Sequence, residues 1–118
     1  MQDFRKLNVW EKAHALTLDI YLTSRKFPKD ELFALTNQLR RASSSIGANI
    51  AEGCGRMSQK EFHHFLSIAI GSASEVEYFL ILAKDLNYFL QIDYEKLNEQ
   101  VNEVKRKLIS LLKKVGKL

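Results

Sequence analysis

The sequence is poor in residues that cross-link or interrupt a chain, with one cysteine, one proline and five glycines among 118 residues. The lone Cys54 excludes an intrachain disulfide and fits a reducing compartment, so we expect a cytoplasmic protein. No apolar run approaches the roughly 20 residues that span a bilayer. The polar N-terminus does not resemble a signal peptide. We therefore expect no membrane partner.

Strand-like alternation is also lacking, and apolar residues instead recur at spacings of three and four. Asn8 with Glu11, and Ser58 with Glu61, have the spacing of capping boxes at helix starts. Asp93 is a candidate cap for the last helix. The resulting prediction is four helices, at residues 9–26, 30–53, 59–89 and 93–115.

Short connections between four amphipathic helices favour antiparallel neighbours, and a seven-residue repeat favours left-handed packing. The predicted fold class is all-α, a single domain over residues 1–118. Its architecture is an antiparallel, up-down-up-down four-helix bundle. The apolar stripe of the second helix begins at Leu32 in this prediction.

The second and third predicted helices have too little polar surface, because small or apolar residues lie opposite their core stripes. A helix that is apolar on two faces is usually buried on both. We therefore predict a homo-oligomer, and the alternative is a tightly packed single bundle. The predicted interface consists of Ser45, Ala48, Ser67, Gly71, Ser74, Tyr78, Ile81 and Leu82.

Candidate catalytic and metal sites are weak in this sequence. Cys54 with His63 and His64 suggests a metal or a nucleophile, but adjacent histidines diverge by about 100° on a helix. A loop cysteine and two surface histidines explain them better. Glu61 and His64 have the Glu-x-x-His spacing of di-iron bundles once, without the required second copy. We predict no catalytic residue, no metal and no cofactor.

Positive charge gathers toward the C-terminus, where residues 105–118 contain six cations and no acid, within a net charge of +4. Such a cluster can follow a nucleic-acid backbone. The alternative is a solvated helix end, where cations favour the helix dipole. The candidate contacts to RNA or DNA are Arg40, Arg56, Lys60, Lys105, Arg106, Lys107, Lys113, Lys114 and Lys117.

The segment Gln38–Gly53, with its Asn49-Ile50-Ala51-Glu52-Gly53 string, resembles the four-helix-bundle family encoded by intervening sequences of bacterial 23S rRNA genes. Leu7–Ala13 and Ala69–Glu77 match as well. The resemblance implies a ring, typically a pentamer, and a likeness to the nucleic-acid-binding accessory proteins of diversity-generating retroelements. It implies no catalytic residues, and its "ribosomal" label is no evidence of a place in the ribosome. The matching polar residues suggest a structural network of Arg41, Asn49, Glu52, Glu75 and Glu77.

Two functions follow from these observations. The first is a non-enzymatic homo-oligomer that binds RNA or DNA through repeated basic surfaces. The second is a protein-binding scaffold, for example for a polymerase, with no direct role in binding nucleic acid. Retention of a partner after nuclease treatment would distinguish the second from the first.

Overall fold

The computed structural model describes residues 2–116, which form four long helices and no strand. A 3₁₀ turn, η1 (Phe4–Lys6), precedes the first long helix, and another, η2 (Lys29–Glu31), lies between the first two. The long helices are α1 (Asn8–Ser24), α2 (Leu35–Cys54), α3 (Gln59–Asp85) and α4 (Gln91–Gly116). The all-α prediction is confirmed.

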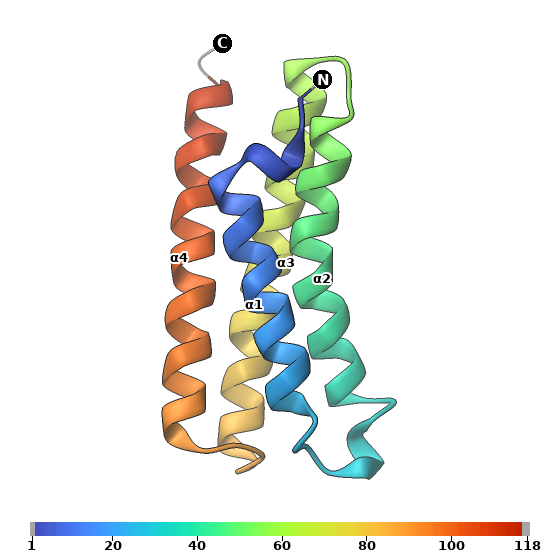
Figure 1. The fold of residues 1–118 in the computed structure, drawn as a ribbon, viewed down its shortest axis with the longest axis vertical. Coiled ribbons are helices and arrows are strands. Elements are labelled where there is room, and N and C mark those ends of the chain that lie inside the picture. The colour runs from blue at the N-terminus through green and yellow to red at the C-terminus, as the bar shows by residue number, and fades with distance from the viewer. Residues whose placement is uncertain (1, 117–118) are drawn as a thin grey trace.

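The helices pack as a square, in which α1 and α3 lie at diagonal corners and each contacts both α2 and α4. Consecutive helices run in opposite directions, as Figure 1 shows. The described chain measures 45 × 23 × 20 Å along its principal axes. The four-helix bundle predicted from the periodicity is therefore the observed architecture, while its left-handed packing stays a prediction.

One stripe from each helix fills the core between the four axes. The fully buried side chains include Leu16 and Ile20 of α1, Ile46 of α2, Leu80 of α3 and Leu108 of α4. Burying a side chain of this size stabilises the fold by about 1.5–3 kcal/mol. The three-and-four spacing thus identifies the core faces of all four helices.

The second helix starts later than predicted, at Leu35 rather than at residue 30. Residues Lys29–Glu31 form the 3₁₀ turn, and Leu32, expected in the core stripe, is 45% exposed. Tyr88 Oη donates a hydrogen bond to Glu31 Oε2 at 2.6 Å, which ties this segment to the α3–α4 connection. This bond to a distant residue holds the Lys29–Glu31 turn outside α2, although local periodicity predicts that these residues are part of the helix.

The third helix ends earlier than predicted, at Asp85 rather than residue 89. Asn87 has a φ of 62°, in the left-handed region that ends helices. The backbone N–H of Tyr88 bonds the carbonyl of Ala83, and that of Asn87 bonds the carbonyl of Lys84. This pair of bonds is a Schellman motif, with asparagine in the place that glycine usually takes.

The two predicted capping boxes have different outcomes. At α3, Ser58 Oγ accepts a hydrogen bond from the Glu61 N–H at 3.1 Å, so the predicted cap is confirmed. At α1, the capping position belongs to Leu7, Asn8 is already helical and no side chain caps the helix, so that prediction is wrong. Asp93 likewise lies inside the first turn of α4.

Helix α3 is long and apolar enough to cross a membrane by length and composition, alone among the helices of residues 2–116. The sequence pattern predicted no apolar run of membrane-spanning length, and α3 corrects that prediction by its length and composition. Its inner face, from Phe62 to Ala83, is buried in the bundle, as in the core helix of a soluble protein. Only 33% of its apolar window is buried, however, which leaves its outer face to be explained.

Candidate nucleic-acid and assembly surfaces

The C-terminal half of α4, the α2–α3 turn and the N-terminal segment meet at one end of the bundle (Figure 1). We call Lys60, Lys107, Lys113 and Lys114 the basic cluster. Within residues 2–116, none of these ammonium groups has a carboxylate within 4.0 Å. Their charge is therefore free to attract an anion. Lys117, also predicted to contact nucleic acid, lies outside the described residues.

A hollow of about 220 Å³ lies where α4 passes the start of α1. Lys107, Ser110 and Lys114 line it from α4, and Leu7, Asn8 and Val9 line it from the other side. No side chain caps α1, and the backbone N–H groups of Asn8 and Val9, two residues of this lining, have no acceptor within the described residues, whereas those of Trp10 and Glu11 bond the Leu7 carbonyl. A helix N-terminus carries partial positive charge, so the two lysines and the helix dipole favour an anion together.

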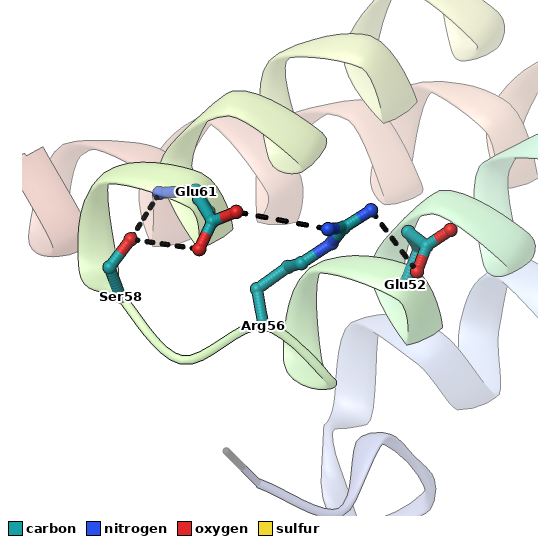
Figure 2. A network of polar contacts seen from close by, with 4 residues as sticks. All are labelled: Glu52, Arg56, Ser58 and Glu61. Atoms are coloured by element: carbon teal, nitrogen blue, oxygen red, sulfur yellow. Dashed lines mark hydrogen bonds and ion pairs between the residues drawn. The ribbon is translucent and has the colours of Figure 1, made fainter.

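Arg56 forms ion pairs with residues on both sides of the α2–α3 turn (Figure 2). Its guanidinium lies 3.7 Å from Glu52 Oε2 and 3.8 Å from Glu61 Oε1, and its carbon stacks 4.8 Å from the centre of the Phe65 ring. These groups link the end of α2 to the first turn of α3. Arg56 is better placed to brace the turn than to contact phosphate.

Arg40 is also occupied within the bundle. Its Nε donates to Ser24 Oγ at 2.8 Å, its Nη2 donates to the Tyr21 carbonyl at 3.3 Å, and it stacks over the Tyr21 ring. The arginine therefore joins α2 to α1. The expectation that it contacts phosphate does not fit this geometry.

Lys105 and Arg106 of α4, the remaining predicted phosphate contacts, also have acidic neighbours within the subunit. Lys105 Nζ binds Glu77 Oε1 at 2.8 Å and links α4 to α3. Arg106 is exposed, but it lines a hollow of mixed charge with Lys96, Glu99 and Glu103, where the two carboxylates oppose an anion. Sequence alone could not separate Lys105 and Arg106 from the three lysines that α4 contributes to the basic cluster, because all five lie on one helix.

The predicted polar network is divided into separate contacts and does not form one system. Asn49 Nδ2 donates to the carbonyl and Oγ of Ser45, whose Oγ shares a 2.9 Å hydrogen bond with Ser72 on α3. Glu52 pairs with Arg56, and Glu77 with Lys105, as described above.

Arg41 and Glu75, the other predicted members, are exposed and unpaired among the described residues. Both line a polar hollow of about 510 Å³ between α2 and α3, together with Phe33 and Phe79. The hollow therefore brings these two opposite charges to one side of the same subunit, without an ion pair within 4.0 Å.

Most of the predicted interface residues lie at the surface. Exposed members are Ala48, Ser67, Gly71, Ser74, Tyr78 and Ile81, while Ser45 and Leu82 are half-buried. The side chains of Tyr78 and Ile81 are 58% and 42% exposed. The structure thus locates an apolar outer face on α3, and the oligomer itself stays a prediction.

Sequence reasoning missed a second apolar surface, a groove of about 480 Å³ between α1 and α2. We call it the α1–α2 groove, and its lining is Phe4, Trp10, His14, Thr17, Leu18, Tyr21, Ser44, Gly47, Ala48 and Ala51. The signal was present in the first helix, where Leu18 lies off the core stripe and is 57% exposed.

Cys54 is a core residue and not the predicted loop cysteine. It is the last residue of α2, and only 1% of its surface is exposed. This burial raises the pKa of the thiol, so the thiol stays protonated and unreactive near neutral pH. Across residues 2–116, no three His, Cys, Asp or Glu side chains come together as metal ligands.

The chain is similar to known proteins in sequence and in fold. A family model described as 23S rRNA-intervening sequence protein matches residues 5–110. A crystal structure from Bacteroides thetaiotaomicron, of a protein with unknown function in the S23 ribosomal protein family, has 32% sequence identity and a TM-score of 0.82. The match covers 89% of this chain and 95% of that one. No curated protein matches the chain.

Proposed function

The chain belongs to the family of 23S rRNA-intervening sequence proteins, and we propose that it is a non-enzymatic, homo-oligomeric bundle that binds RNA or DNA. One observation supports the binding most directly. Lys107 and Lys114 flank a hollow at the uncapped start of α1, with no acid in its lining. Cations beside a helix N-terminus are a usual means of holding a phosphate.

Assembly would multiply this weak site. Each copy of the chain carries one basic cluster, so a ring, such as the pentamer that the family resemblance implies, repeats it around the axis. Every neutralised phosphate releases counterions, and the slope of log affinity against log salt grows by about 0.9 per contact on B-DNA. Binding through the phosphate backbone predicts little preference for sequence.

The test is fluorescence anisotropy with single- and double-stranded RNA and DNA across a salt titration. Replacing Lys107 and Lys114 with Glu is expected to weaken binding to all sequences alike. It should also lower the salt slope by about 1 for each lysine that contacts a phosphate. The matched control replaces Lys26 and Lys29 with Glu, because both are exposed at the opposite end of the bundle. Equal losses in the two double variants would contradict the proposed site.

A second function, a protein-binding scaffold for a partner such as a polymerase, is favoured by the opposite end of the bundle. There the connections and the first turn of α4 expose large apolar side chains, namely Phe33 (91%), Ile92 (71%) and Leu90 (67%). Exposed apolar groups gathered in one place are typical of protein contacts. Co-purification of a defined partner that survives nuclease treatment, and is lost on replacing Phe33 and Ile92 with Ser, would support this function.

A further inference from the structure

The polar hollow between α2 and α3 gathers side chains that have no partner within the subunit. We call it the α2–α3 hollow. It measures about 510 Å³, and its lining is Phe33, Asn37, Gln38, Arg41, Ala42, Ser45, Glu75 and Phe79. None of the four amide or charged side chains in this lining forms a hydrogen bond or ion pair within residues 2–116. Four polar groups that converge on one space are therefore open to a ligand.

Helix packing places the two charges of this hollow at one level of the bundle. The helices α2 and α3 run in opposite directions, and Ser45 Oγ shares a 2.9 Å hydrogen bond with Ser72 Oγ. Arg41 lies one turn before Ser45 on α2. Glu75 lies about one turn after Ser72 on α3. The hollow thus has a hydrogen-bond donor on its α2 wall and an acceptor on its α3 wall.

Two aromatic rings line the same hollow. Phe33 precedes α2, and its side chain is 91% exposed. Phe79 follows Glu75 by one turn on α3 and is half-buried. Unpaired nucleic-acid bases stack on aromatic side chains, while polar groups beside the ring bind the edges of the base. The α2–α3 hollow combines both kinds of group.

The mixed charge of the lining excludes simpler occupants. A free anion is opposed by Glu75, and a metal cation is opposed by Arg41. An apolar segment would cover the four polar side chains without satisfying them, which is unfavourable. A flat ligand that both donates and accepts hydrogen bonds fits the rings and the charges together.

Guanine has the pattern that these charges require. A guanidinium donates two parallel N–H bonds, which match the adjacent acceptors O6 and N7 of guanine. A carboxylate accepts two bonds, which match the adjacent donors N1–H and N2–H. Adenine, cytosine and uracil each lack a pair of neighbouring donors. Arg41 on one wall and Glu75 on the other therefore favour guanine.

We propose that the α2–α3 hollow binds a guanine base, with Arg41 donating to O6 and N7, Glu75 accepting from N1–H and N2–H, and Phe33 stacking on the ring. The proposal deepens the proposed function and rests on it for the source of the base, an unpaired nucleotide of RNA or single-stranded DNA. The hollow lies toward the start of α2, and the basic cluster lies at the other end of the bundle (Figure 1). Phosphate contacts supply affinity, and the hollow adds a preference for one base.

The first test uses nucleosides, which carry no phosphate and so do not depend on the basic cluster. Guanosine titrated into ¹⁵N-labelled protein is expected to shift the side-chain amide signals of Asn37 and Gln38. It should bind about tenfold more tightly than adenosine, the discrimination expected of a bidentate pair. Equal binding of the two nucleosides, or binding of neither, would overturn the proposal. Signals that shift on dilution of the protein alone would place a second copy in the hollow and would also overturn it.

The second test matches each side chain with the edge it binds. Inosine, which lacks the N2 amino group, should bind wild type about tenfold more weakly than guanosine, and Glu75→Gln should bind both equally weakly. 7-Deazaguanosine, which lacks the N7 acceptor, should show the same relation with Arg41→Lys, because lysine keeps the charge and loses the fork. The matched control is Glu99→Gln, at an exposed position on α4, which should keep the wild-type preference. A preference for guanosine over inosine that survives in Glu75→Gln would overturn the proposal.

A third measurement separates this proposal from the proposed function. Fluorescence anisotropy compares two single strands that differ by one guanine replaced with adenine. Wild type should favour the strand with guanine, and Glu75→Gln should bind both alike. Strand binding that depends on Lys107 and Lys114 but ignores the guanine would overturn the hollow alone. Guanosine binding without strand binding would support the hollow and contradict the proposed function.

Discussion

At one end of the bundle, packing, a helix cap and ion pairs hold the α2–α3 turn and leave one large apolar side chain, Met57, exposed, whereas the other end exposes Phe33, Leu90 and Ile92. The turn end, residues 53–58, has a closely packed Gly53, a serine cap at Ser58 and the Arg56 contacts. The open end, formed by the α1–α2 and α3–α4 connections, is linked by the Tyr88–Glu31 hydrogen bond and exposes Phe33.

This difference separates two uses of surface. At the turn end, Gly53, Arg56 and Ser58 already have partners within the subunit, so changes to these residues should alter folding. At the open end, the exposed groups contribute little to the subunit, so changes there should alter contacts with other molecules. The following measurements test that distinction, beginning with the largest expected effect.

Gly53→Ala should lower the free energy of unfolding by about 1–3 kcal/mol, because the new methyl overlaps the packed α2–α3 contact. Its Cβ would lie 2.9 Å from Phe65 Cβ and 3.0 Å from Phe62 Cδ1. Chemical denaturation measures the change. Gly55→Ala is the control, since its nearest neighbour would be at an ordinary 3.5 Å. Equal losses in the two variants would show that packing is not the cause.

Ser58→Ala should cost about 1 kcal/mol of stability, the usual value for losing an N-cap. The α1 start provides the comparison, because Asn8 forms no cap there. Asn8→Ala should therefore change the free energy of unfolding by less than about 0.5 kcal/mol. Thermal and urea denaturation of both variants test this contrast, and a large loss in Asn8→Ala would contradict the observed cap positions.

Alkaline pH should destabilise the turn end through Cys54. Burial raises the pKa of its thiol in the folded state, so the unfolded chain releases that proton at lower pH. The folded state then holds more protons, and stability falls as pH rises above the ordinary thiol pKa of about 8.5. Urea titrations between pH 8 and pH 10 should show this decline. In Cys54→Ala the slope should be smaller, and an unchanged slope would exclude the thiol as its source.

Phe33→Ser should have the smallest effect on folding, within about 0.5 kcal/mol, because the side chain is 91% exposed. The same change should abolish any partner contact made through the open end. Denaturation and partner co-purification measure the two effects separately. A loss of stability well above this limit would show that Phe33 packs within the subunit in solution.

Local sequence signals predicted the regular parts of this fold well. The three-and-four spacing of Leu16, Ile46 and Leu80 identified core positions that the structure buries completely. The signals failed where distant residues decide the local conformation. The Glu31–Tyr88 bond spans 57 positions in the sequence, and no local pattern announces it.

The candidate sites show even more clearly that local sequence signals do not predict contacts between distant residues. Composition identified arginine and lysine as possible phosphate contacts, but it could not show which of them have partners already. Arg40 is held by α1, and Lys105 by Glu77, whereas Lys107 and Lys114 remain free of carboxylates among the described residues. Pairing depends on which helices become neighbours, and that is a tertiary property.

The sequence by itself determined that the chain forms four amphipathic helices with short connections, because the apolar periodicity acts within a few residues along the chain. It also showed that α3 has too little polar surface. Only the tertiary structure decided that α1 and α3 lie at diagonal corners, and that small residues of α2 leave a groove beside α1. These features depend on helix packing, which brings together side chains far apart in the chain.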